Sequence, residues 1–480
     1  MRSSPAGRDG ALPEPAAEPE TGAPGSGSRR TNILLATCLA SFLPPFMSSA
    51  LNLATPALGN DLPASAVQVN WIVSAFLVAS ASCLLPFGRL GDMLGRKKLF
   101  VVGMTAYAAF SAACGLAPSA TTLIGLRALQ GAGGAIGFAS SVAILTSAFP
   151  QGQRGRVLGI NSAAVYTGLS LGPVIGGVLT QQLGWRSVFF VSAALGVPAA
   201  LLMMLRVDEE WRGARGEAYD AGGALLWMGS LAMLMVGVST LKAMEAGRWI
   251  ALVGCAGAIG FIARELRAPH PILELRLFRN VVFAFSNLAA LVNYSATFAV
   301  TFLLSLYLQA VRGLSPQSAG VILLIQPVLM TLLSPLAGRV SDRVEPRLVA
   351  STGMALTSLA LVLFARLGTT SPLGAVALGL VLIGVGFGLF SSPNTNAVMS
   401  AVEARSYGVA AATLGTMRQV GQALSMSVVA LVFAQVMGSG RIVRENAPLI
   451  LASTHVIFSL LASLCVAGVF ASLARGRVQR

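Results

Sequence analysis

The sequence has little charge and few of the residues that build soluble active sites. Only 11% of its 480 residues are charged, against roughly 25% in soluble globular proteins. Its five cysteines all lie in apolar runs without a C-x-x-C pair, which favours buried hydrophobic side chains over disulfide or metal chemistry. Two histidines are too few for a metal site. We also find no nucleotide-binding loop and no nucleophile–base pair, so we predict no enzyme, no catalytic residues, no cofactor and no metal.

Long apolar runs recur from Ile33 to the C-terminus, and 55% of all residues are hydrophobic. The hydrocarbon core of a bilayer requires about 20 apolar residues per helix, and in lipid only helices or closed barrels satisfy the backbone. These runs are continuous rather than alternating, which indicates helices. We therefore predict an all-α polytopic membrane protein with fourteen transmembrane helices between residues 33 and 473, the first of them retained rather than cleaved as a signal peptide.

Basic residues are distributed unevenly between the two sides of this arrangement. An even number of helices places both termini on one side, and the tails and loops of that side contain 24 of the 33 Lys and Arg residues, against seven in the opposite loops. The positive-inside rule therefore predicts cytoplasmic N and C termini in the plasma membrane. The same asymmetry explains the net charge of +15 without a nucleic-acid partner.

The sequence also repeats itself. GRLGDMLGRK at 88–97 returns as GRVSDRVEPR at 338–347, and GFASS at 137–141 returns as GLFSS at 388–392. Two similar halves around a midplane site are a transporter architecture. We predict a disordered cytoplasmic tail at 1–30, a six-helix bundle at 31–206, a linker with two extra helices at 207–279, a second six-helix bundle at 280–474 and a cytoplasmic tail at 475–480.

Three motifs follow one another along the first half. The loop after the second helix contains Gly88, Leu90, Asp92, Gly95, Arg96 and Lys97. The fourth helix contains Leu123, Arg127, Gln130 and Gly131. The fifth helix contains Gly168, Gly172, Pro173, Gly176 and Gly177. With these motifs in order, the chain after residue 30 resembles the major facilitator superfamily, in its fourteen-helix drug–proton antiporter branch.

The resemblance implies a secondary active transporter that exports drugs, antibiotics or secondary metabolites by alternating access. Its partners are then a small-molecule substrate, the lipid bilayer and a proton as coupling ion, and a monomer is expected. One alternative is a voltage-driven exporter of an acidic metabolite. Another is an uptake transporter, although the motif of the fifth helix argues against uptake. A membrane sensor with the same fold would require an appended soluble domain, for which the tails are too short.

The loop motif is expected to act as a conformational latch. Gly88 and Gly95 allow a tight turn, and Asp92 can accept hydrogen bonds from helix N-terminal amides or from a neighbouring arginine. A merely topogenic loop explains the basic residues but neither Asp92 nor the two glycines. The resemblance implies that the loop holds the cytoplasmic ends of the two halves together in the outward-open state. The predicted latch comprises Gly88, Asp92, Gly95, Arg96, Lys97, Gly338 and Asp342.

The fifth helix presents Gly168, Gly172 and Gly176 on one face. Small residues at this spacing let membrane helices pack closely, and Pro173 bends the helix. Ordinary membrane packing would explain the same pattern. The resemblance implies that this antiporter motif, with Gly177, lies at the interface between the halves, favours exchange and limits leak.

Charged and polar residues inside apolar runs are the candidates for the substrate cavity or a proton relay. An ionised side chain within a membrane helix costs at least about 2.5–3.5 kcal/mol on insertion scales, so it is expected to face a cavity or a partner. Arg127 and Arg418 are the two cases, although Arg127 could instead extend to the outer interface. The candidates are Arg127, Gln130, Asn52, Tyr166, Asn287, Tyr294, Gln326, Arg418 and Gln422. Softer candidates are Ser48, Asn161, Asn394 and Asn396.

One departure from the family pattern concerns acidic residues. The antiporter branch usually has an aspartate on the first helix, and alignment of Asn52, Ala54 and Pro56 places Met47 there. None of the 18 acidic residues lies at mid-membrane depth. If Arg127 and Arg418 both face the cavity, it contains positive charge only, and we therefore expect a neutral or anionic substrate.

Overall fold

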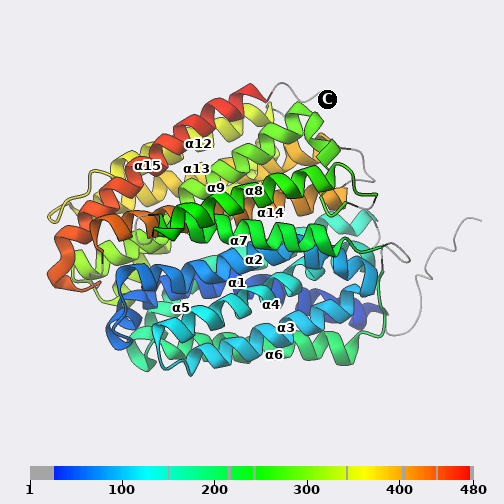
Figure 1. Ribbon diagram of the computed structural model, residues 1–480, viewed down its shortest axis with the longest axis horizontal. Helices are drawn as coiled ribbons and strands as arrows, with labels where there is room; N and C mark the ends of the chain where they lie inside the picture. Colours follow the sequence, from blue (N-terminus) through cyan, green and yellow to red (C-terminus); the bar gives the residue numbers. More distant parts are fainter. Residues whose placement is uncertain are drawn as a thin grey trace, which may run out of the picture.

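The computed structural model is a bundle of long helices (Figure 1). Within the described residues, fourteen helical segments are long and apolar enough to cross a membrane, which confirms the predicted number. The structure describes residues 26–149, 151–212, 218–241, 245–269, 271–273, 275–341, 344–402, 407–438 and 442–475. Most of the predicted N-terminal tail and residues 476–480 lie outside these ranges.

The first six spans form one bundle, coloured blue to green in Figure 1. Its helices are α1 (Ser26–Asp61), α2 (Ala66–Leu94), α3 (Arg96–Gly115), α4 (Ala120–Ala148), α5 (Gln151–Leu183) and α6 (Arg186–Arg206). Helix α1 packs on α5, α2 packs on α4, and α3 packs on both α4 and α6.

The last six spans form the second bundle, coloured yellow-green to red. Its helices are α9 (Val281–Leu306), α10 (Pro316–Leu323), α11 (Ile325–Ser341), α12 (Pro346–Phe364), α13 (Leu373–Ser400), α14 (Tyr407–Val436) and α15 (Ala447–Ala474). The tenth of the predicted spans is divided at Leu324 into α10 and α11. Helix α9 packs on α14, α11 packs on α13, and α12 packs on α13 and α15, which repeats the pairing of the first bundle.

Two extra helices lie between the bundles, namely α7 (Ala221–Thr240) and α8 (Ala246–Glu265). Helix α7 packs on α8 and also contacts α2 of the first half and α14 of the second. The Ser427 hydroxyl donates to Met235 Sδ over 3.4 Å, and the Tyr219 hydroxyl donates to the Pro86 carbonyl over 3.3 Å. The hairpin therefore covers the seam between α2 and α14.

Several helices begin at side chains that accept a backbone N–H. Ser65 precedes α2, where its hydroxyl accepts from Gln68 N at 3.2 Å and the Gln68 side chain accepts from Ser65 N at 3.0 Å. Asp220 accepts from Gly223 N at the start of α7, and Asn280 accepts from Phe283 N at the start of α9. These caps satisfy amides that have no partner within the helix.

Candidate functional site

A cluster around Arg418 lies where α9, α13 and α14 meet. Arg418 Nη2 donates to Thr395 Oγ1 over 2.7 Å, and its guanidinium carbon lies 5.5 Å from the centroid of the Tyr294 ring. Arg418 Nε is buried and has no hydrogen-bond partner in the described part of the chain. The arginine therefore keeps one donor free while a ring and a hydroxyl fix its position.

Aromatic and hydroxyl groups extend this cluster to the first half of the molecule. The Tyr294 and Phe387 rings pack edge to face, with centroids 5.2 Å apart. Tyr166 on α5 lies 3.2 Å from Ser391 Oγ on α13, hydroxyl to hydroxyl. Because Tyr166 lies halfway along α5, this contact joins the two halves near the middle of the bundle.

The structure places Arg127 apart from this cluster, inside the first half. Its side chain is fully buried, and Nε donates to the Ile72 carbonyl over 3.0 Å. Its guanidinium carbon lies 4.5 Å from the Phe76 ring centroid and 5.9 Å from that of Phe189. Gln130 accepts from Arg127 Nη1. These partners belong to α2, α4 and α6, so the structure does not bring Arg127 next to Arg418, although both were candidates for one cavity.

Four other candidates form no hydrogen bond with Arg418 within the described residues. Three lie elsewhere in the bundle, and the fourth is one helical turn away from Arg418. The Asn52 carbonyl accepts from Ser305 Oγ at 2.6 Å. Asn287 donates to the Phe283 carbonyl of its own helix over 2.9 Å, and Gln326 lies 3.9 Å from Met330 Sδ. Gln422 follows Arg418 by one turn and is half-buried.

The softer candidates are also spread over several elements. Ser48 and Asn161 are buried. Asn394 donates to the Ser286 carbonyl over 3.1 Å, and Asn396 donates to Ser341 Oγ over 3.4 Å. Buried amides at such positions join helices to one another as readily as they contact a ligand.

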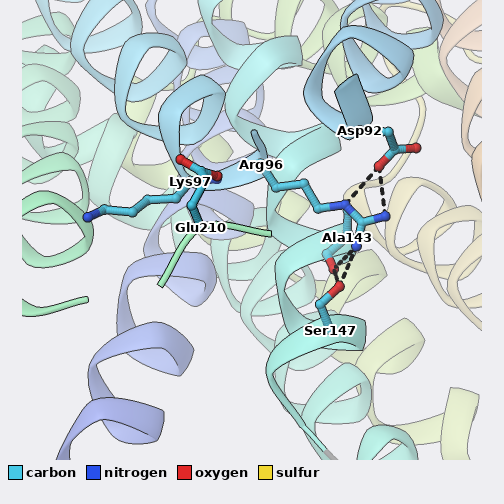
Figure 2. A network of polar contacts seen from close by, with 6 residues as sticks. All are labelled: Asp92, Arg96, Lys97, Ala143, Ser147 and Glu210. Carbon is cyan, nitrogen blue, oxygen red and sulfur yellow. Dashed lines mark hydrogen bonds and ion pairs between the residues drawn. The ribbon is translucent and has the colours of Figure 1, made fainter. Parts of the chain in front are cut away.

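The predicted loop is mostly helical, because α2 continues through Gly88 to Leu94 and only Gly95 separates it from α3. The residues of this loop motif form a polar network within the first half (Figure 2). Arg96 Nε donates to Asp92 Oδ1 over 2.7 Å, so Asp92 binds a neighbouring arginine, one of the two partners expected for it. Arg96 Nη1 also donates to the Ala143 carbonyl over 3.1 Å and to Ser147 Oγ. The network ties the end of α2 and the start of α3 to the end of α4. A contact between halves through this loop stays a prediction, and Asp342 lies outside the described residues.

Glu210 is a member of this network that the sequence analysis did not identify. Its carboxylate accepts from Lys97 N at 2.9 Å and from Lys98 N at 3.2 Å, and so caps the start of α3. Gly95 has φ of 128°, and a Cβ there would lie 2.5 Å from the Glu210 carboxyl carbon. The positive φ is what requires a glycine, because the carboxylate of Glu210 is the end of a flexible side chain and could move aside for a Cβ. The acidic run after α6 was the available signal, but nothing local linked it to residue 97.

The glycines of α5 face two different helices. A Cβ on Gly172 would lie 2.5 Å from Ser49 Cβ, and one on Gly176 would lie 2.5 Å from Ala50 Cα, both on α1. Gly168 similarly faces Phe42 of α1. These three glycines therefore let α5 and α1 pack closely within one half.

Gly177 and Pro173 of the same motif face the second half. A Cβ on Gly177 would lie 2.8 Å from the Pro316 carbonyl oxygen, and one on Gly320 would lie 2.4 Å from the Pro173 carbonyl oxygen. The hydrogen bond from Ser305 to Asn52 joins α9 to α1 near the same end of the bundle. The two halves are therefore in direct contact at the end that is predicted to face outward.

A further residue without a sequence signal is Arg475, directly after α15. Its side chain is buried, and Nη1 donates to Asn394 Oδ1 over 2.9 Å and to Ser286 Oγ over 3.3 Å. Nη2 donates to the Pro346 carbonyl over 3.1 Å. Burial lowers the pKa of Arg475 to about 10, so the side chain remains charged at neutral pH. Arg475 thus joins the end of α15 to α9, α12 and α13.

Thr395, Ser391 and Phe387 were also absent from the sequence candidates. A signal for one of them existed, because Ser391 lies in the repeated GLFSS segment. Among the described residues, no group of three His, Cys, Asp or Glu side chains could hold a metal ion. The Arg418 cluster presents a guanidinium, hydroxyl groups and aromatic rings to one another, which are groups that can form hydrogen bonds and ring contacts with a ligand.

Comparison with known proteins agrees with this architecture. Residues 37–426 match the Major Facilitator Superfamily. The chain is 28% identical over 439 residues to the riboflavin transporter RibZ of Clostridioides difficile, covering 91% of this chain and 95% of that protein. It is 32% identical over 430 residues to a tetracenomycin C resistance and export protein of Streptomyces glaucescens, covering 88% and 80%.

The fold is also similar to that of a solved peptide transporter, POT, in complex with sulfate. The TM-score is 0.69 at 14% sequence identity, with 94% of this chain and 95% of that chain covered. At that identity the likeness concerns the fold alone. The chain belongs to the Major Facilitator Superfamily and is a multi-pass protein of the cell membrane.

Proposed function

We propose that this transporter exports neutral or acidic small molecules, of the antibiotic or secondary-metabolite kind, by alternating access between its two halves. The observation that carries the proposal is the Arg418 cluster, where a partly buried guanidinium, two aromatic rings and hydroxyls of both halves come together. No ion pair of Arg418 occurs within the described residues. Similarity to an antibiotic export protein supports export as the direction.

Electrostatics favours anions at this cluster. At about 6 Å and an effective dielectric near 20, a cation is repelled by one guanidinium by about 3 kcal/mol, which corresponds to roughly 100-fold in affinity. An anion is attracted by a similar amount. Because Arg127 lies inside the first half, this attraction comes from the single charge of Arg418.

The charged residues also bear on how transport is driven. Family resemblance favours proton antiport, in which a buried carboxylate normally exchanges a proton for substrate. Met47 occupies the usual position of that carboxylate and is fully buried. An acidic substrate leaving an inside-negative cell gains about 2.3 kcal/mol per charge per 100 mV, so export driven by voltage is the second candidate. Because the chain is also similar to a riboflavin transporter, uptake is the third candidate.

A paired efflux assay in a pump-deficient host tests the substrate class. Ethidium serves as the cation and an acidic aromatic compound as the anion. We expect export of the anion, a loss of about 10- to 100-fold in Arg418→Gln, and no loss in the matched control Arg366→Gln, which changes an exposed arginine. Robust ethidium export abolished by collapse of the pH gradient would contradict the proposal.

Reconstituted liposomes separate the coupling modes. A pH gradient and a membrane potential are imposed one at a time on purified protein. Anion export driven by the pH gradient alone supports proton antiport, and export driven by potential alone supports the voltage-driven alternative. Accumulation of substrate inside right-side-out vesicles under a physiological gradient would identify an uptake transporter.

A further inference from the structure

A groove of about 860 Å³ opens where α7 begins and α8 ends. It is independent of the Arg418 cluster and of the direction of transport. The wall combines small, apolar, aromatic and basic side chains, principally Tyr219, Leu226, Gly260, Ala263, Arg264 and Arg267. A Cβ on Gly260 would meet no atom within 4 Å, so there is open space in the groove beside this glycine.

The hairpin that forms this groove faces outward over most of its surface. Only 17% of the apolar stretch of α8 is buried, the lowest share among the fourteen spans. Leu225 and Ile259 are 70% and 68% exposed. In a membrane protein such faces contact acyl chains, since apolar side chains there have no other partner in the described part of the chain.

Helix geometry places the groove at headgroup depth. At the other end of α8, the Arg248 guanidinium carbon lies 5.4 Å from the Trp249 ring centroid, a pair typical of the membrane interface. Arg267 follows Arg248 by nineteen residues, and at 1.5 Å per residue this is about 29 Å along the helix. That distance matches the hydrocarbon thickness of about 30 Å.

The charges around the groove leave basic donors available. Asp220 accepts from Arg264 Nε at 2.8 Å and from Nη2 at 2.6 Å, which neutralises the acid and fixes the arginine. The Arg264 guanidinium holds the pKa of the Asp220 carboxyl below its usual range, so the pair persists at neutral pH. Glu265 is buried and accepts from Leu273 N at 2.9 Å. Arg267 is exposed and forms no ion pair within the described residues.

We propose that this groove binds an anionic phospholipid, with its phosphate at Arg267 and Arg264 and an acyl chain along Leu226, Gly260 and Ala263. A phosphodiester contributes one negative charge and several acceptors, which complement the one uncompensated guanidinium and the free donors of the other. The extra hairpin thereby becomes a lipid-binding element at the seam between α2 and α14.

Native mass spectrometry of the purified full-length protein tests this site. Phosphatidylglycerol and phosphatidylcholine with identical acyl chains are titrated separately. We expect phosphatidylglycerol to bind at least fivefold more tightly, and this preference to fall at least fivefold in Arg267→Gln. The matched control is Arg248→Gln at the opposite end of the same helix, which should keep the preference.

A second pair of variants tests the groove without a change of charge. Gly260→Leu fills this open space, and because no atom lies within 4 Å of its Cβ, the helix should fold normally. We expect phosphatidylglycerol binding to fall in Gly260→Leu but not in Gly374→Leu, another open glycine on α13. Equal binding of both lipids, wild-type preference in Arg267→Gln, wild-type phosphatidylglycerol binding in Gly260→Leu, or an equal loss in Arg248→Gln would overturn the proposal.

Discussion

Buried arginines with neutral partners are the main polar feature at the residue scale. Arg127 is held by a carbonyl, an amide and two rings. Arg418 is held by a hydroxyl and one ring. Arg475 is held by two side-chain oxygens and a carbonyl. Such partners satisfy part of each guanidinium without neutralising it. Of the three, Arg418 belongs to the cluster that includes a contact between the halves, from Tyr166 to Ser391.

We predict that Arg475 stabilises the second half. Arg475→Gln should lower the free energy of unfolding by about 1–3 kcal/mol, because Asn394 Oδ1 and the Pro346 carbonyl lose their donor in a buried site. Arg475→Lys should recover part of this loss, since one donor remains. Thermal unfolding of the purified protein measures the effect. Arg366→Gln, at an exposed arginine, is the control, and an unchanged midpoint in Arg475→Gln would refute the role.

At the element scale, α5 has two packing faces that serve different purposes. Gly168, Gly172 and Gly176 seat α1 within one half, whereas Pro173 and Gly177 meet α10 of the other half. The motif therefore combines tight packing of a helix pair with a contact that must separate during transport.

We predict that Gly172→Leu separates α5 from α1 and abolishes transport. Its Cβ would lie 2.5 Å from Ser49 Cβ and 2.9 Å from the Phe46 carbonyl oxygen, so at least one helix must move. Overpacking of this kind costs roughly 1–3 kcal/mol or more. Gly125→Leu, at a glycine of α4 with open space around it, should transport normally. Efflux at matched expression compares them, and normal efflux by Gly172→Leu would show that the face is not packed in the membrane.

At the scale of the whole molecule, the two halves are in contact at the predicted outer end through α5–α10 and α1–α9. Alternating access requires these contacts to break whenever the molecule opens toward that end. Their strength relative to the contacts of the inner end sets the population of each state.

We predict opposite effects for two adjacent glycines. Gly177→Ala should weaken the contact with Pro316 and increase the outward-open population about 5- to 30-fold if 1–2 kcal/mol of closure is lost. Gly176→Ala should instead disturb α1 packing and lower thermal stability without changing that population. Spin labels at Leu183 and Leu373, both exposed at the outer end, report the distance between halves. Identical distance distributions in wild type and Gly177→Ala would contradict the prediction.

The sequence by itself determined the number of spans and the order of the motifs, although the predicted loop at 88–97 is helical except at Gly95. Hydropathy is sufficient to count the spans, because a chain segment in lipid must form all its backbone hydrogen bonds within a helix, and the bilayer thickness sets the length of that helix. The tertiary structure decided which face each polar residue presents. Arg127 and Arg418 look alike in sequence, yet one is enclosed by α2, α4 and α6 and the other meets α9 and α13. Glu210 and Arg475 reach partners 113 and 81 residues away. Helix rotation and such distant contacts depend on the packing of all neighbouring helices at once, which no local pattern encodes.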